Sequence, residues 1–337
     1  MNIQENISLK EYNTFGIDKK ARFFTEAHNI EDILEAQQFA RDKGLELFVL
    51  GGGSNILLTQ DLNAVVLKIN LCGIELLEEN EDSVLVKVGA GEVWHDFVLE
   101  AISRNWAGVE NLSLIPGTVG ASPMQNIGAY GVEIKEIFHS LEAVERSTGK
   151  VKTFTQQECQ FGYRESIFKT TEKGKFIITS VTFQLSKQPV FNTSYGAISD
   201  TLKAMKVTDL NLKAISDAVI QIRQSKLPDP KKIGNAGSFF KNPTIAEGQY
   251  QELKATHPSI PGYPNDEGVK VPAAWLIEQA GWKGKRFGQI GVHELQPLVL
   301  VNYGDGEGAD IKALSRKIQE DVKSKFGIDL HPEVNFI

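Results

Sequence analysis

Cysteine and clustered histidine are what this sequence lacks most clearly. The 337-residue chain contains only two cysteines, Cys72 and Cys159, which stand far apart in mixed apolar settings. Two such thiols form neither a disulfide framework nor the paired spacing of a zinc knuckle. No two of the six histidines show the His-x-x-x-His spacing of helical metal ligands. The sequence therefore predicts inert thiols and no metal site.

Long apolar runs and clusters of positive charge are also missing. No stretch approaches eighteen consecutive apolar residues, and the polar amino terminus lacks the hydrophobic segment of a signal peptide. The formal net charge is −7 and the isoelectric point is near 5.5, without a dominant run of lysine and arginine. This composition argues against nucleic acid and anionic membranes as partners. We expect a cytoplasmic protein that is a monomer.

Hydrophobic residues make up 41% of the chain, enough to bury a core over two or three domains. Apolar positions recur at helical spacing after Asn29, after Gly91, from Leu212 to Ile222 and from Ile311 to Phe326. Strand-like runs cover residues 45–50, 64–69, 83–88, 140–144, 151–154, 176–185 and 298–302. Strands dominate the middle of the chain, so the predicted fold class is α+β rather than regular βαβ.

Glycine is concentrated in two segments of the sequence. The segment from Pro116 to Gly131 holds four glycines, two prolines and several neutral hydrogen-bonding residues, a composition poorly suited to a helix or a strand. The run Gly51-Gly-Gly-Ser-Asn55 follows the first predicted strand and offers bare amides to an anionic group such as a diphosphate. Two such loops suggest one large nucleotide cofactor, although both could instead be ordinary turns.

The common nucleotide motifs are absent from the first loop. A dinucleotide fingerprint would need a third glycine at Ile56, and a P-loop would end in Gly-Lys-Ser/Thr where Asn55 to Leu58 stand. The first loop therefore matches neither the dinucleotide-binding fingerprint nor the P-loop.

Three further segments contain residues suited to catalysis or ligand binding. Phe161-Gly-Tyr-Arg-Glu-Ser166 places an aromatic ring beside a guanidinium that can fork onto a carboxylate. Gly234 to Pro243 brings a serine into a tight, small-residue setting before two phenylalanines, and Glu333 lies among apolar residues near the carboxyl end. Taken singly, such residues are more often a surface arginine, a turn serine and a solvated glutamate than parts of a functional site.

Together these segments resemble one family, the UDP-N-acetylenolpyruvoylglucosamine reductases, also called UDP-N-acetylmuramate dehydrogenases. The motifs follow the family's order from Tyr12-Asn-Thr-Phe-Gly16 through both glycine loops, Gly162-Tyr-Arg164, Gly237 to Pro243 and the final His-Pro-Glu-Val. The stretch Asn192-Thr-Ser-Tyr195-Gly resembles the tyrosine loop of the family's longer type.

The resemblance implies a two-lobed FAD-binding domain of the vanillyl-alcohol-oxidase class and a C-terminal α+β substrate domain. Its implied limits are residues 1–70 for the first lobe, with 327–337 returning to it, 71–188 for the second lobe, and 189–326 for the substrate domain. It also implies non-covalent FAD, with NADPH as electron donor. The reaction implied is reduction of UDP-N-acetylglucosamine enolpyruvate to UDP-N-acetylmuramate, with hydride at C3 and a proton at C2, in peptidoglycan precursor synthesis.

The resemblance also assigns residues to roles. Arg164 would hold the substrate carboxylate, Ser238 would donate the proton, and a protonated Glu333 would bind the developing enolate. The residues implied in substrate binding are Tyr163, Tyr195, Lys226, Asn242, Lys283 and Gln296. The residues implied in FAD binding are Gly51, Gly52, Gly53, Ser54, Asn55, Pro116, Gly117, Gly120, Ala121, Pro123, Gln125, Asn126, Gly128, Ala129 and Gly131.

Two other readings use the same glycine loops. One is an oxygen-using flavin oxidase, against which stands the lack of a histidine near residues 51–58 to tether the flavin. The other is a non-catalytic nucleotide-binding module, which leaves the coincidence of Arg164, Ser238 and Glu333 unexplained. Nothing in the chain resembles a separate dinucleotide fold, so we expect NADPH and the UDP-sugar to use one pocket in turn.

Overall fold

The computed structural model describes residues 1–195 and 197–337, and it divides the chain into two units. The first unit comprises Met1–Ile7, Ala21–Gly52 and Leu62–Ser225. The second comprises Ser8–Lys20, Gly53–Asp61 and Lys226–Ile337. Residue 196, the end of the expected tyrosine loop, lies outside the described residues. Because both units draw on separated segments, neither is a continuous stretch of sequence.

A four-stranded sheet holds the N-terminal part of the first unit. Its strands run in the order β1 (Gln4–Ser8), β2 (Lys20–Ala27), β5 (Leu62–Ile69) and β3 (Glu46–Leu50). Both β2 and β3 pair with β5 in parallel. Helix α1 (Ile30–Lys43) begins at Asn29, whose side chain accepts from the Asp32 amide at 2.8 Å, and ends at Gly44 with φ 62°.

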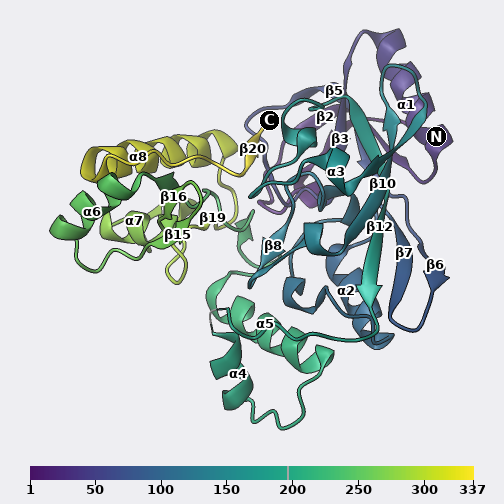
Figure 1. Cartoon of the computed structure of the whole chain (residues 1–337). Coiled ribbons are helices and arrows are strands. Elements are labelled where there is room, and N and C mark those ends of the chain that lie inside the picture. Colours follow the sequence, from purple (N-terminus) through teal and green to yellow (C-terminus); the bar gives the residue numbers. More distant parts are fainter. Residues whose placement is uncertain (196) are drawn as a thin grey trace. The chain divides into compact units, whose positions relative to one another are not determined.

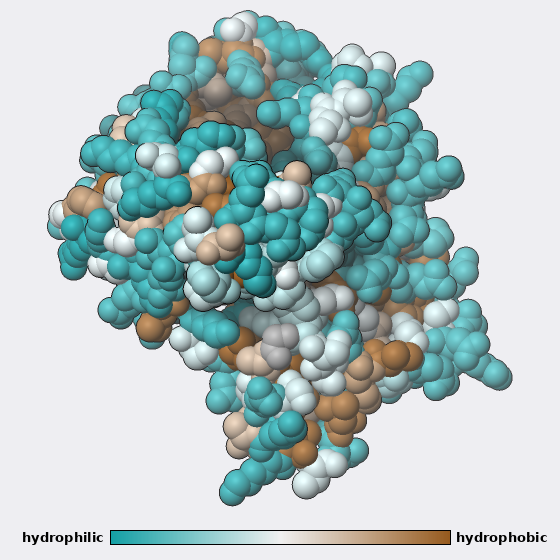
Figure 2. Space-filling model, turned by 60° about the vertical axis from the view of Figure 1, so that its left-hand side comes forward, coloured by the Kyte–Doolittle hydropathy of each residue, from teal (hydrophilic) through white to brown (hydrophobic). Residues whose placement is uncertain are grey.

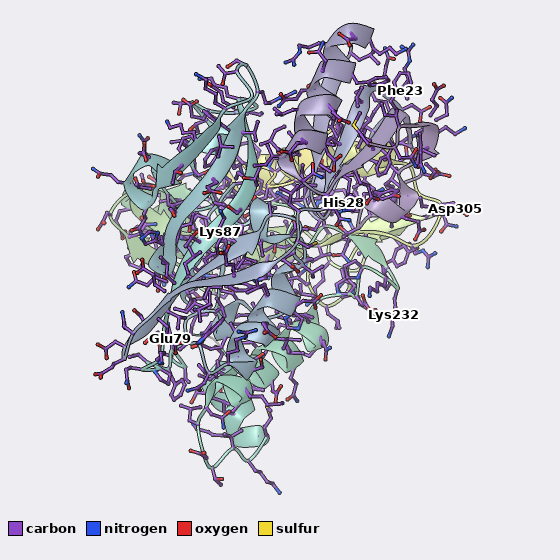
Figure 3. All side chains as sticks on the ribbon, turned by 90° about the vertical axis from the view of Figure 1, so that its right-hand side faces the viewer. Phe23, His28, Glu79, Lys87, Lys232 and Asp305 are labelled. Atoms are coloured by element: carbon purple, nitrogen blue, oxygen red, sulfur yellow. The ribbon has the colours of Figure 1, made fainter. Side chains whose placement is uncertain are left out.

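Apolar side chains join α1 to this sheet. Phe23, labelled in Figure 3, packs edge-on against Phe39 of α1 with ring centroids 5.2 Å apart. Leu47 and Val65 are buried in the same core. The parallel strands are therefore covered by apolar contact, as parallel sheets require.

A five-stranded antiparallel sheet forms the middle of the first unit, with β10, β12 and β7 side by side in Figure 1. Its strands run in the order β11 (Val151–Thr155), β10 (Phe138–Glu145), β12 (Phe176–Ser186), β7 (Ser83–Gly89) and β6 (Ile74–Glu79). Helix α2 (Trp94–Ser103) contributes Phe97, which stacks on Phe183 with centroids 5.1 Å apart. Lys87, also labelled in Figure 3, pairs with Glu142 across the sheet at 2.7 Å.

Three α-helices, four short 3-10 helices and two short strands complete the described part of the first unit. Ser216 of α5 and Ser113 have their hydroxyl oxygens 2.8 Å apart in a buried position. The helices are α3 (Gln156–Cys159), α4 (Ile198–Ala204), α5 (Leu212–Lys226), η2 (Glu110–Leu112), η3 (Val119–Ala121), η4 (Ile134–Glu136) and η5 (Ile167–Lys169), and the short strands are β8 (Gly128–Ala129) and β9 (Val132–Glu133).

The second unit has three small sheets, three α-helices and one short 3-10 helix, and α8 lies alongside α7 and β19 in Figure 1. One sheet has the order β13 (Gly234–Asn235), β19 (Leu300–Asn302), β18 (Ile290–Val292) and β17 (Arg286–Phe287). Another has the order β14 (Thr244–Ile245), β16 (Gly268–Lys270) and β15 (Tyr263–Asn265). The remaining elements are η1 (Lys10–Tyr12), α6 (Glu247–Thr256), α7 (Ala273–Gln279), α8 (Gly308–Phe326), β4 (Ile56–Leu57) and β20 (Asn335–Phe336).

Early and late segments of the chain are bonded together within the second unit. The Asn302 side chain donates to the Phe15 carbonyl at 2.9 Å, and the Asn235 amide donates to the Thr14 carbonyl at 2.9 Å. At the carboxyl end, β20 pairs with β4 in parallel. The unit therefore depends on pairings between residues more than two hundred positions apart.

The two cysteines have different surroundings. Cys72 is exposed, Cys159 is buried, and both are free. Within the described part of the chain, no helix has the length and apolarity needed to cross a membrane, and no group of three or more acidic, histidine or cysteine side chains is placed to hold a metal. Polar residues cover most of the face drawn in Figure 2, with apolar residues in small patches.

Candidate active site

The two glycine-rich segments meet within the first unit. A Cβ on Gly51 would lie 3.0 Å from the Thr118 hydroxyl, and one on Gly52 would lie 2.8 Å from the Cα of Gly117. Real Cβ atoms avoid such distances, so these positions require glycine because two backbones approach closely. The loops predicted separately from the sequence thus form one cradle.

Backbone hydrogen bonds fix the second loop against the sheet and α2. Gly117 accepts from the Trp94 amide at 3.0 Å, the Val119 amide donates to Glu92 at 2.8 Å, and the Gly120 amide donates to Ala90 at 2.9 Å. A side chain on Gly120 would overlap Ala90. The backbone of this segment is therefore held in one conformation by its neighbours, unlike that of an isolated surface turn.

Lys68 supports the first loop and was not singled out from the sequence. Its Nζ donates to the Gly51 carbonyl at 3.2 Å from strand β5. Burial lowers the pKa of Lys68, while Glu26 opposes that shift. A lysine inside a strand gives no sequence signal of this role, because the contact depends on the parallel pairing of β5 with β3.

The remainder of the first glycine loop belongs to the second unit. A Cβ on Gly53 would overlap the Tyr12 carbonyl oxygen, and the Thr14 amide donates to the Gly53 carbonyl at 3.1 Å. The Asn55 side chain donates to the Glu333 carbonyl at 3.2 Å. The Tyr12 to Gly16 motif and the glycine loop are thus in direct contact.

These observations fit a bound FAD. Gly51 and Gly52 place main chain rather than side chains where the two loops meet. Main-chain amides at such a junction can bind the diphosphate of the cofactor. Gln125 and Ser122 lie in the same loop, and Ser122 is buried with its hydroxyl on the Val119 carbonyl at 2.7 Å. The residues present are suited to a non-covalently held dinucleotide.

Arg164 lies in the first unit, in a turn closed by paired bonds between Gly162 and Glu165. Its backbone has φ +56°, and its side chain is one-fifth exposed. The guanidinium donates to the Asn126 carbonyl at 3.4 Å and to the Gly128 carbonyl, both in the second glycine segment. It also lies over the Tyr163 ring, 5.3 Å from the centroid. The predicted carboxylate-binding arginine is thus attached to the predicted cofactor loop.

Tyr195 is exposed and packs edge-on against Tyr130 of the glycine-rich segment 116–131, with ring centroids 6.4 Å apart. Asn111 donates to the Tyr130 carbonyl at 3.1 Å and to the Asn192 carbonyl at 2.9 Å. The tyrosine loop is therefore tied to the glycine-rich segment within the first unit.

Ser238 and Glu333 come together in the second unit. The Phe239 carbonyl accepts from the Glu333 amide at 2.8 Å, and Phe240 pairs with Pro332 in an antiparallel bridge. Ser238 is exposed, whereas Phe239 and Phe240 are buried. The two buried phenylalanines anchor this segment while the serine residue stays exposed.

The predicted substrate residues of the second unit have separate environments. Asn242 accepts from the Ala273 amide at 2.9 Å at the start of α7. Lys283 pairs with Glu278 at 2.8 Å, and the Gln296 carbonyl accepts from the Val299 amide at 3.0 Å. Lys226 is exposed at the end of α5. The contacts described here do not bring these four side chains together, so their common role stays a prediction.

Two buried polar groups were missed by sequence reasoning. Arg223 Nε and His293 Nδ1 are buried without a hydrogen-bond partner in the described part of the chain. Burial lowers the pKa of both groups, opposed at Arg223 by Tyr130 and at His293 by Glu294. Neither residue stands in a recognisable motif, because a lone arginine in a helix and a lone histidine after a strand carry no pattern.

The fold and the glycine cradle define an FAD-binding protein with a C-terminal α+β domain. A family model described as FAD binding domain matches residues 21–155, and one described as UDP-N-acetylenolpyruvoylglucosamine reductase, C-terminal domain, matches residues 229–337.

Close relatives extend over the whole chain. A UDP-N-acetylenolpyruvoylglucosamine reductase of Flavobacterium johnsoniae is 52% identical over 100% of both chains, and that of Pseudomonas putida is 49% identical over 98% of both. The crystal structure of the Thermus caldophilus enzyme of the same name is similar in fold, with a TM-score of 0.70 at 22% identity over 100% of this chain and 99% of that one. The chain belongs to the UDP-N-acetylenolpyruvoylglucosamine reductase family, which confirms the resemblance of its motifs.

Proposed function

We propose that the chain catalyses the NADPH-dependent reduction of UDP-N-acetylglucosamine enolpyruvate to UDP-N-acetylmuramate with FAD as cofactor, in peptidoglycan precursor synthesis. The observation that carries this proposal is the backbone pairing of Glu333 with Phe239 beside Ser238, inside the segment that the C-terminal family model matches. Relatives about half identical over the whole chain carry the name of this reductase.

When bound, FAD supplies the hydride-transfer chemistry of the reaction. Gly51, Gly52 and the segment 116–131 would hold it through main-chain contacts. In this proposal residues 1–70 and 71–188 form the two lobes around FAD, residues 189–326 bind substrate, and residues 327–337 return to the first lobe.

The role of the protein's own residues is to stabilise the negative charge that develops on the substrate. Addition of hydride at C3 of the enolpyruvyl group builds negative charge on C2 and on the carboxylate oxygens. Arg164 binds that carboxylate, since a guanidinium fork matches its two oxygens. Glu333, in its protonated form, hydrogen-bonds the charge that develops beside it.

Ser238 donates the proton to C2. A serine hydroxyl is a weak acid, so this role requires a very basic carbon and a nearby cation that polarises the hydroxyl. Lys226 is our candidate for that cation. Tyr163, Tyr195, Asn242, Lys283 and Gln296 bind the remainder of the UDP-sugar, and NADPH uses the same pocket in turn. The setting we propose is the cytoplasm, with the chain acting as a monomer.

Anaerobic stopped-flow absorbance at the flavin bands tests this function. NADPH should bleach the flavin of the purified protein, and UDP-N-acetylglucosamine enolpyruvate should then restore its colour without oxygen. A flavin that recovers only with oxygen would point to an oxidase, and a protein without flavin would contradict the cofactor assignment.

A further inference from the structure

Glu133 lies beside the predicted catalytic arginine, in a position that no motif singled out. Its Oε1 is 3.9 Å from the Nη1 of Arg164, and its Oε2 accepts from the Asn126 side chain at 3.0 Å. Lys135 Nζ lies 3.0 Å from the same Oε2. The side chain is only 22% exposed, so solvent screens these contacts incompletely.

Asn126 joins the glycine segment to the turn that carries Arg164. Its buried side-chain amide donates both to Glu133 and to the Gly162 carbonyl at 3.0 Å, and its Oδ1 accepts from the Lys135 amide at 3.1 Å. The Asn126 carbonyl accepts from Arg164. One residue therefore contacts Glu133, the base of the arginine turn and the guanidinium itself.

Gly128 leaves the space in which these side chains meet. A Cβ there would lie 2.8 Å from the Cγ of Glu133 and 3.0 Å from the Nη1 of Arg164. Its φ is not in the left-handed region, so conformational freedom does not explain the glycine. The close approach of these two side chains and of the Val132 carbonyl oxygen, 2.9 Å from that Cβ, explains it.

We propose that Glu133 is a positioning residue that, together with Asn126 and the carbonyls of the glycine segment, orients the Arg164 guanidinium toward the enolpyruvyl carboxylate. This inference rests on the proposed function, since it takes Arg164 as the group that holds that carboxylate. A guanidinium has five N–H donors in a fixed plane. Acceptors that bind some of these donors therefore set the direction in which the others point. A small error in that direction costs much of the rate.

The competing explanation is a purely local role in the short helix η4. The Glu133 side chain and Glu136 form a reciprocal capping box, in which the Glu133 amide donates to the Glu136 carboxylate at 2.8 Å. The two explanations predict different effects of replacing Glu136. Replacing Glu136 damages the same cap without removing a group that contacts Arg164.

The test compares Glu133→Gln with the control Glu136→Gln in the flavin-loaded protein, measuring the two half-reactions separately without oxygen. For Glu133→Gln we expect reoxidation by UDP-N-acetylglucosamine enolpyruvate to slow about tenfold to a hundredfold, because the fork loses its orientation. Flavin reduction by NADPH should change by less than about twofold in both variants, and Glu136→Gln should reoxidise at nearly the wild-type rate. Should Glu133→Gln lose its flavin, Glu133→Asp, which keeps the charge but withdraws the carboxylate, should show the same selective loss.

A double-mutant cycle separates positioning from mere stability. The dissociation constant of the enolpyruvyl substrate is measured on the oxidised protein from the change in flavin absorbance, with and without Arg164→Met. In the Arg164→Met background, Glu133→Gln should weaken binding by less than about twofold. An equal loss in both backgrounds, or a Glu136→Gln effect as large as that of Glu133→Gln, would overturn the inference. If wild-type protein itself fails to reoxidise with this substrate, the proposed function fails instead.

Discussion

The Glu333 amide donates to the Phe239 carbonyl at 2.8 Å, immediately after Ser238 in the chain. The pairing continues as the Lys241 amide donates to the His331 carbonyl at 2.9 Å. The spacing of the serine and the glutamate is thus set by main chain and by two buried phenylalanines. Either side chain can be altered without releasing the other.

Replacing Ser238 with alanine should separate the two half-reactions. We expect enolpyruvyl reduction to fall about a hundredfold to ten-thousandfold, because the proton donor is lost, while NADPH still reduces the flavin at the wild-type rate. Single-turnover absorbance without oxygen measures both steps. Ser199→Ala, at an exposed position in α4, is the matched control and should leave both rates unchanged. Equal loss in both half-reactions would contradict the proton-donor role.

Gly52→Ala should weaken flavin binding. The new Cβ would lie 2.8 Å from the Gly117 backbone, and moving that backbone should raise the flavin dissociation constant about tenfold or more. Fluorescence titration of the apoprotein with FAD measures this change. Gly248→Ala, at a helical position with open space around it, should leave flavin affinity unchanged. Unaltered affinity in Gly52→Ala would argue against the cradle.

Excess UDP-sugar substrate should inhibit NADPH oxidation competitively. The reason is that both ligands are expected to occupy one pocket in turn. Steady-state rates over a grid of both concentrations reveal the pattern, in which added NADPH relieves the inhibition. Absence of inhibition at high substrate would favour separate sites.

Ionised Asp321 should stabilise the fold, and this stabilisation should be lost in acid. Hydrogen bonds from Lys325 and Trp282, at 2.9 and 2.8 Å, lower the pKa of Asp321 below its ordinary 3.8. Because the folded-state pKa is depressed, this stabilisation is present above the unfolded pKa and is lost as pH falls through the folded one. The melting temperature of Asp321→Asn should therefore lie furthest below wild type near neutral pH and approach it in strong acid. Asp305→Asn, whose carboxylate is 92% exposed, should show no such convergence.

Alkylation should distinguish the two cysteines. Burial raises the pKa of the Cys159 thiol to about 12, so its thiolate is scarce and inaccessible in the folded protein. Iodoacetamide should label native protein at Cys72 alone, slowly because partial burial also raises the pKa of that thiol, and should label both residues after denaturation. Mass spectrometry identifies the site, and rapid native labelling of Cys159 would contradict its burial.

Local patterns predicted the local structure well. Asn29 and Gly44 delimit α1 as expected, Gly327 ends α8, and the predicted strands at 83–88 and 176–185 are β7 and β12. These signals succeed because caps, periodicity and β-branched runs act over a few residues. The family motifs similarly indicated the fold class, α+β with an FAD-binding domain.

Long-range relationships could not be predicted from these patterns. Strand β2, in which the three consecutive residues Phe23 to Thr25 are buried, was not singled out, and its parallel partner β5 lies about forty positions away. Lys68 and Glu133 gain their roles only when distant backbone folds beside them. The division of the chain into two interleaved units likewise depends on contacts such as that of Asn302 with Phe15.

That last contact has a consequence for biosynthesis. Residues 8–20 and 53–61 leave the ribosome early, yet their partners in the second unit lie at positions 226–337. The parallel sheet and the five-stranded sheet of the first unit can close while these early segments still lack their partners. The Phe15 ring is wholly buried in the finished fold and packs edge-on against Phe239, so we expect it to lack that partner until residue 239 has been made. Slowing translation between positions 62 and 225 should lengthen that interval and lower the yield of folded protein.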